Sequence, residues 1–221
     1  EDSRKADGLI LLGYGDFDDY SRRLDQLVTQ GTHFVRWGSA DPAHPGTVIG
    51  CDNVMGGRDA GAHLIARGRR RIAFLGDASS DYPESRDRYR GLAGTLRDAG
   101  LAVDPGLQVD ALSSEASGYD AARRLSARGI AFDAIFAASD MIALGAVRAL
   151  AESGRSVPDD VALVGFDDIP AASLAQPPLT TVRQDYAQAG ELLVDMLIRR
   201  INRKDTAPAL LAPELVVRKS T

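Results

Sequence analysis

Polar side chains that could bind a small molecule stand directly after several short apolar runs of this sequence. These positions are Asp52 and Asn53, Asp77 to Ser80, Ser139 and Asp140, and Asp167 and Asp168. Carboxylate, amide and hydroxyl groups form hydrogen bonds, so each position could hold a polar ligand. If the runs are parallel strands of an open sheet, ligands sit beyond their carboxyl ends, where these residues would gather. The pattern predicts a binding edge without specifying its ligand.

The sequence carries none of the usual catalytic signatures. It has no GxxxxGK[ST] phosphate loop, no GxSxG nucleophile motif and no HExxH zinc motif. The GYGDFD segment at Gly13 has only two glycines of a dinucleotide fingerprint, so a turn after a strand is the favoured interpretation. Cys51 ends an apolar run and His63 lies in a helical pattern, which favours buried packing roles for both. We therefore expect no enzyme activity, no cofactor and no metal.

Composition and charge indicate a folded, soluble protein. Of 221 residues, 44% are hydrophobic and 26% are charged, which excludes a disordered chain, a collagen and a coiled coil. No apolar run approaches the roughly 18 residues that a membrane span needs, so we expect no membrane partner. The net charge of 26 − 31 = −5 disfavours binding nucleic acid through a broad basic surface. The one basic cluster, Arg67 and Arg69 to Arg71, spans a helix end and a strand start, which favours a structural role.

Short apolar runs alternate with longer amphipathic stretches along the whole chain. The expected strands are 9–12, 33–37, 48–51, 71–76, 107–109, 134–138, 161–166, 180–182 and 214–217. The expected helices are 18–30, 53–67, 85–99, 115–127, 139–152 and 186–203. Five helical patterns are followed by a glycine that could close the helix, at Gly31, Gly68, Gly100, Gly129 and Gly154. The alternation predicts an α/β fold with parallel sheets covered by helices on both faces.

Five segments are informative when they are taken together. They are CDNVMGGRDAGAHLIARGRRRIAFLG from residue 51, SRDRYRGLAGTL from 85, AIFAASDMIALGAVRAL from 134, VPDDVALVGFDDIPAASLAQPPLTTVRQD from 157 and PELVVRKST from 213. In this order and spacing the chain resembles the LacI/GalR family of bacterial transcription regulators. The resemblance implies the periplasmic-binding-protein type I fold: α/β, with two doubly wound parallel-sheet subdomains joined by three crossovers. It also implies a small effector in the cleft between them and a cytoplasmic homodimer.

The resemblance further implies how the chain is divided. We expect an N-terminal subdomain from residues 1–77 plus 185–208 and a C-terminal subdomain from residues 78–184 plus 209–221. The crossovers would then lie near Gly76–Ser80, Thr181–Tyr186 and Ala207–Ala212. Residues 5–12 resemble the segment that opens the third strand of the family core, so the N-terminal subdomain is expected to be incomplete. Operator DNA would be bound only through an N-terminal helix-turn-helix that lies outside this chain.

Two residues match the family's main effector contacts. Arg88 matches an arginine that pairs with ligand hydroxyl or carboxylate groups, and its planar fork can hold vicinal hydroxyls. The alternative is an exposed arginine on a helix face. Asp167 matches an aspartate that accepts hydrogen bonds from ligand hydroxyls, and an ionised carboxylate complements the donors of a sugar. The alternative is a turn residue at the end of a strand.

Four further residues are candidate effector contacts. Ser139 stands where sugar-responsive relatives often have Asn, although it also suits a helix N-cap. Met55 matches a position that contacts effector in some relatives, and could equally be core. Tyr186 matches a crossover position where a ring can stack on a sugar, or simply pack at the hinge. Tyr82 is a further candidate in the loop before residue 85 that no specific motif supports.

The sequence therefore predicts the effector-binding and dimerisation core of a transcriptional repressor. The effector would be a sugar or related metabolite. The alternative is a periplasmic sugar-binding protein of a transport system, which would share the fold and the cleft. The GFDD segment from Gly165, the PPLTTVRQD segment from Pro177 and the final PELVVRKST favour the regulator. An α/β enzyme would require a nucleophile or metal site, and the sequence offers neither.

Overall fold

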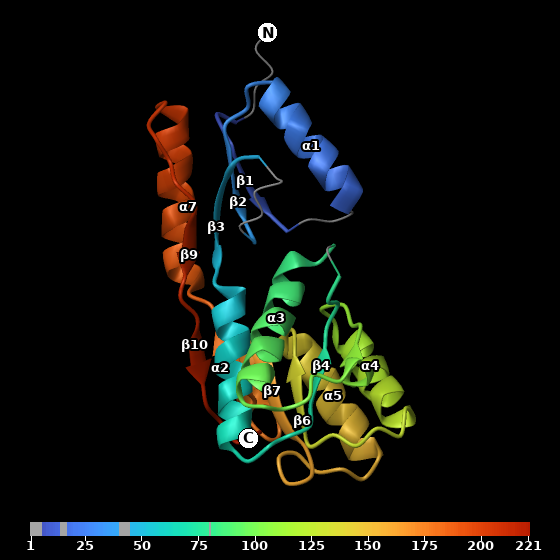
Figure 1. The fold of residues 1–221 in the computed structure, drawn as a ribbon. Helices are drawn as coiled ribbons and strands as arrows, with labels where there is room; N and C mark the ends of the chain where they lie inside the picture. Colours follow the sequence, from blue (N-terminus) through green and yellow to red (C-terminus); the bar gives the residue numbers. More distant parts are fainter. Residues whose placement is uncertain (1–5, 14–16, 40–44, 80) are drawn as a thin grey trace. The chain divides into compact units, whose positions relative to one another are not determined.

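The computed structural model describes residues 6–13, 17–39, 45–79 and 81–221 (Figure 1). The chain forms two compact units, each built from separate parts of the sequence. Unit 1 contains residues 1–52 and 185–212, and unit 2 contains residues 53–184 and 213–221. Each unit has its own sheet, so each is described by itself.

Unit 1 is built on a parallel sheet whose strand order is β1-β2-β3-β9. The strands are β1 (Leu9–Leu12), β2 (Phe34–Trp37), β3 (Thr47–Cys51) and β9 (Ala209–Leu211). Helices α1 (Phe17–Thr29) and α7 (Tyr186–Ile201) cover opposite faces (Figure 1). Successive side chains of a strand point to opposite faces. Phe34 therefore packs against Leu24 of α1, whereas Val35 packs against Leu193 of α7.

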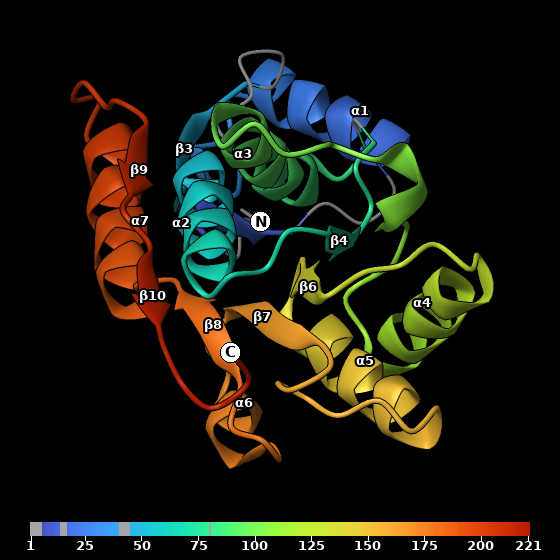
Figure 2. The same ribbon diagram turned by 60° about the horizontal axis from the view of Figure 1, so that its bottom comes forward.

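Unit 2 is built on a six-stranded sheet of order β10-β8-β7-β6-β4-β5, parallel except for the pairing of β10 with β8. The strands are β4 (Ile72–Leu75), β5 (Gln108–Val109), β6 (Ala134–Ala137), β7 (Ala162–Asp167), β8 (Thr180–Arg183) and β10 (Glu214–Val216). The helices are α2 (Asn53–Ala66), α3 (Pro83–Asp98), α4 (Glu115–Ala127), α5 (Asp140–Glu152) and α6 (Pro170–Leu174), with a 3₁₀ turn at Pro105–Leu107. Figure 2 shows α2 and α3 on one face and α4 and α5 on the other. The core between these layers is apolar and fully buried, as at Phe74, Phe136 and Phe166.

The expected α/β class with parallel sheets is confirmed, and each expected strand and helix overlaps an observed one. All five helix-closing glycines have the left-handed backbone, with φ between 67° at Gly31 and 85° at Gly68. The short elements β9 and α6 were missed. Helix α6 has the sequence PAASL, which is too short to show the apolar spacing by which a helix is recognised.

The chain is divided differently from the expectation at two of the three crossovers. Residues 53–77, expected in the N-terminal subdomain, belong to unit 2, because β4 pairs with β5 and β6 and α2 packs against α3. Residues 209–212 belong to unit 1, because β9 pairs with β3 in the register Ile49 to Ala209. The chain therefore passes between units at 52/53, 184/185 and 212/213. The first crossover is not at Gly76–Ser80.

Helix α3 approaches α2 through glycines. A Cβ at Gly91 would overlap the carbonyl oxygen of Val54 and the backbone nitrogen of Arg58. Backbone cannot move aside as a flexible side chain can, so we expect Gly91→Ala to lower the free energy of unfolding by about 1–3 kcal/mol. Gly94 lies on the same helix with nothing within 4 Å of its Cβ position. Gly94→Ala is the matched control.

The Gly94→Ala variant should be more stable than the wild type by about 0.5–1 kcal/mol, because alanine loses less backbone entropy in a helix. Urea unfolding of both variants measures the difference. Equal stabilities for the two alanine variants would contradict the close approach of α2 and α3.

Candidate functional site

Arg88 is the central cation at the carboxyl end of the unit 2 sheet. It lies in the second turn of α3 and is buried, with its guanidinium 3.6 Å from the centre of the Phe166 ring. Its Nε donates to Asn53 Oδ1 at 2.8 Å, and its Nη1 donates to the carbonyl oxygen of Ala138. Among the described residues, Nη2 makes no hydrogen bond. Arg88 is therefore held rigidly by two acceptors and keeps a donor group for a ligand.

Asp167 lies beside Arg88, so the structure brings together the two main candidates. Its Oδ1 accepts from Gln184 Nε2 at 2.7 Å and lies 3.9 Å from Nη1 of Arg88. Asp167 has a φ of +108°, which is uncommon for a residue with a side chain. Such strained backbone persists where the surroundings hold it, frequently at binding sites. Fixed donors and a fixed acceptor in one cluster suit a ligand with neighbouring hydroxyl groups.

Asp140, the first residue of α5, is fully buried directly behind this cluster. Its Oδ1 accepts from Thr181 Oγ1 at 2.5 Å and its Oδ2 accepts from the backbone nitrogen of Ile169 at 2.9 Å. Burial raises the pKa of Asp140 to about 7, although these two hydrogen bonds oppose the rise. Gly165 of β7 makes the space, because a Cβ there would overlap Oδ1 of Asp140. Asp140 thus joins α5, β8 and the turn after β7.

The other candidates of unit 2 have different surroundings. Ser139 is buried and caps α5, accepting from the backbone nitrogen of Ile142 at 3.3 Å, and its Oγ also accepts from Ser113 at 3.0 Å. Met55 lies in the first turn of α2 and is 40% exposed. Tyr82 immediately precedes α3 and is 41% exposed. Exposure leaves both side chains accessible to a ligand, whereas Ser139 already serves the helix.

Tyr186 is the one candidate in unit 1. It is the first residue of α7, half of its side chain is exposed, and its ring centroid lies 6.1 Å from that of Trp37. The rings are tilted by 54°, an arrangement between stacked and edge-to-face. Trp37 ends β2, so this aromatic pair marks the carboxyl end of the unit 1 sheet. The sequence predicts Trp37 at the end of an expected strand but not among the candidate site residues.

Sequence reasoning also missed several polar and apolar residues near the carboxyl ends of the unit 2 strands. Asn53, Gln184 and Thr181 contribute hydrogen bonds, and Leu112 and Met141 are exposed just beyond β5 and at the start of α5. In the sequence, Asn53 is recognisable only as a polar residue after an apolar run, and the others belong to no motif. The carboxyl-end rule applied to every strand would have found Leu112, because it follows β5 closely.

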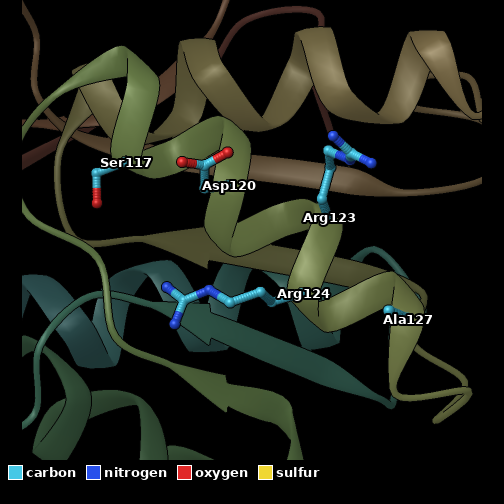
Figure 3. Close-up of a pocket in the computed structure, with 5 residues that line it drawn as sticks. All are labelled: Ser117, Asp120, Arg123, Arg124 and Ala127. Atoms are coloured by element: carbon cyan, nitrogen blue, oxygen red, sulfur yellow. The ribbon is translucent and has the colours of Figure 1, made fainter.

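The described residues also form hollows away from this cluster. A shallow pocket lies on α4 alone, lined by Ser117, Asp120, Arg123, Arg124 and Ala127 (Figure 3). Arg124 there donates to the carbonyl oxygen of Asp110, which gives it a structural role. Within the described residues, no three metal-binding side chains come together, and no helix is long and apolar enough to cross a membrane.

Comparison with known proteins places this geometry in a family. Residues 62–221 match the model of the periplasmic binding protein-like domain. The solved structure of a transcriptional regulator CelR–cellobiose complex superposes with a TM-score of 0.90 at 36% identity, covering 99% of this chain and 67% of that one. The chain belongs to the LacI/GalR family. The resemblance inferred from the sequence is confirmed.

The curated relatives that this chain matches include HTH-type transcriptional regulators and repressors. The HTH-type transcriptional regulator CelR of Thermobifida fusca is 37% identical over 219 residues, which cover 97% of this chain and 63% of the relative. The HTH-type transcriptional repressor PurR of Mannheimia succiniciproducens is 31% identical over 98% of this chain and 65% of its own length. The chain thus spans just under two thirds of these relatives. Membership in this family of regulators agrees with the expectation that the chain is not an enzyme.

Proposed function

We propose that this chain is the effector-binding core of a LacI-type transcriptional repressor, and that its effector is a neutral sugar. The cluster of Arg88, Asp167 and Gln184 carries the proposal. It combines a fixed carboxylate acceptor with guanidinium and amide donors, which complements adjacent sugar hydroxyls. Unit 1, taken by itself, carries an aromatic pair of the kind on which sugar rings stack, the exposed Tyr186 and Trp37.

Within that cluster, Arg88 and Asp167 are the proposed direct contacts. Met55 and Tyr82 of unit 2 and Tyr186 of unit 1 are proposed to line the site. Ser139 is proposed to act through its contact with Ser113, because its own side chain is buried and caps α5. The subdomains named from the sequence are proposed with the crossovers at 52/53, 184/185 and 212/213.

Cellobiose is the first sugar to test, because the relative with a TM-score of 0.90 was solved with it. We expect this chain to bind cellobiose or a related glucose oligosaccharide with a single site per chain in isothermal titration calorimetry. A thermal-shift screen of other sugars, nucleosides and small metabolites accompanies the titration. Stabilisation by nucleosides alone would contradict a sugar effector, and a flat response to all compounds would contradict a small-molecule effector.

Operator control and dimerisation are proposed for the longer protein to which this core would belong. Effector binding would change operator affinity only through a difference in affinity for two states of the protein, with couplings typically about 1–3 kcal/mol. A homodimer would match the two half-sites of an operator. A periplasmic transport protein has less support, because the relatives described above are transcriptional regulators.

A further inference from the structure

Asp168, the neighbour of Asp167, is bound by two arginines. Its Oδ2 accepts from Arg183 Nε at 2.7 Å and its Oδ1 accepts from Arg218 Nη2 at 2.6 Å. Only 8% of the Asp168 side chain is exposed. Arg183 also lies 3.2 Å from Glu214 Oε2. Each carboxylate oxygen of Asp168 therefore has a guanidinium partner of its own.

The charge of Asp168 is maintained by these partners. Burial alone would raise the pKa of Asp168, but hydrogen bonds from Arg183 and Arg218 and their positive charges outweigh burial and lower it. Asp168 consequently remains ionised at neutral pH. Hydrogen bonds between ionised groups are roughly twice as strong as neutral ones, so this carboxylate holds Arg183 and Arg218 strongly.

The two arginines lie in unit 2, on segments next to two of the crossovers between the units. Arg183 ends β8, just before the crossover at 184/185, and Arg218 follows β10, just after the crossover at 212/213. The strands β8 and β10 are themselves antiparallel neighbours, with Arg183 opposite Glu214. One buried carboxylate thus ties both crossover segments to the turn after β7.

That turn is the one that presents Asp167. Asp167 and Asp168 have φ values of +108° and +54°, two consecutive residues in a region that favours glycine. The ion pairs of Asp168 supply a restraint that can hold this backbone. The same restraint keeps the Asp167 carboxylate beside Gln184, which is the next residue after Arg183.

We propose that Asp168 is a positioning residue for the effector: it fixes both crossover segments to the turn that presents Asp167, without contacting the effector itself. The effect on sugar affinity rests on the function proposed above, whereas the anchoring of the two segments does not. Ligand binding at Asp167 and ordering of β8 and β10 are then parts of one coupled event.

The anchoring is tested without a ligand by hydrogen–deuterium exchange of the wild type and Asp168→Asn. Asparagine tolerates the left-handed backbone and keeps the shape of the side chain while removing the charge. We expect exchange to rise about fivefold or more in residues 180–185 and also in residues 214–218, with α4 and α5 unchanged. Asp195→Asn is the matched control, because Asp195 also pairs with an arginine at 2.7 Å but within α7 alone. Faster exchange confined to the turn itself, or unchanged exchange, would overturn the proposal.

The positioning of Asp167 is tested by titrating cellobiose into Asp168→Asn and Asp168→Gly. Glycine adopts the left-handed backbone more readily than aspartate, so it relieves the turn while removing the anchor. We expect both variants to bind about tenfold more weakly or worse, at temperatures well below their unfolding midpoints. Wild-type affinity in Asp168→Gly would overturn the positioning role, since backbone conformation alone would then suffice. If the wild type itself binds no sugar, the proposed effector fails, and the exchange result alone supports or overturns the anchoring.

Discussion

Replacing Asp167 by asparagine should abolish measurable binding of cellobiose while the protein remains folded. The substitution keeps the size of the side chain and tolerates the φ of +108°, but it exchanges a carboxylate oxygen for an NH₂ donor. Hydrogen bonds to charged groups contribute about 1.5–3 kcal/mol each, so the loss of two from a sugar lowers affinity about a hundredfold or more. Calorimetry measures the loss, and circular dichroism checks the fold.

Two variants make this test specific. Asp159→Asn is the matched control, because Asp159 is exposed in a turn before β7, at the opposite end of that strand from Asp167. Its affinity should equal that of the wild type. Arg88→Lys keeps the positive charge but loses the fork that reaches Asn53 and the carbonyl oxygen of Ala138, and should also bind at least about tenfold more weakly. Wild-type affinity in both Asp167→Asn and Arg88→Lys would contradict the site assignment.

The second large effect is a pH dependence of stability that originates at Asp140. The pKa of this carboxyl is raised from 3.8 to about 7 in the folded protein, first by burial and then by the charges of Asp167 and Asp168. Between these two values the folded state binds more protons than the unfolded state. The free energy of unfolding contributed by Asp140 therefore falls as the pH rises from about 4 to about 7, and stays constant above that.

Asp140→Asn removes this titration and keeps partners for Thr181 and the Ile169 amide. Its stability relative to the wild type should rise by about 4 kcal/mol between those pH values, at about 1.4 kcal/mol per unit of pKa. Chemical unfolding at several pH values measures the difference. A relative stability that is flat with pH would show that Asp140 is not buried as an acid.

A variant of opposite sign provides the control. The pKa of Glu152 is lowered, because the hydrogen bond from Tyr119 and the interactions with Arg148 together outweigh the opposing effect of desolvation. A lowered pKa contributes stability that is present above the ordinary value of 4.5 and is lost as the pH falls through the folded value. Glu152→Gln should therefore lose stability relative to the wild type as the pH rises, where Asp140→Asn gains it.

The sequence predicted most of the local structure but less of the long-range arrangement. Helix bounds followed from apolar spacing and from glycines such as Gly129, which closes α4 with a φ of +68°. The boundary at 77/78 was wrong because an apolar run such as Ile72–Leu75 has the same composition in either sheet. Its pairing with β5 and β6, both of which come later in the sequence, assigns it to unit 2.

The site was predictable to the extent that it rests on short motifs. Arg88 and Asp167 came from such motifs, and the structure brings their side chains to within 3.9 Å. Asp140 could be predicted as a helix start, but its raised pKa comes first from burial in the folded core, and the hydrogen bond from Thr181 that opposes the rise comes from 41 positions away in the sequence. Gln184 and Trp37 likewise gain a role only from strand ends that folding brings to the edge of each sheet.

Because unit 1 is built from two parts of the sequence that flank most of unit 2, the two units are completed at different times during synthesis. Residues 53–184, nearly all of unit 2, are synthesised before α7 and β9 exist, and unit 2 then lacks only residues 213–221, which include its edge strand β10. Unit 1 begins first and finishes later, because Val35 and Ile49 have no cover until Leu193 emerges. Domains generally form as their chain is delivered. The nascent chain therefore carries an uncovered apolar sheet face while residues 53–184 are synthesised, and that face is where a chaperone would be needed.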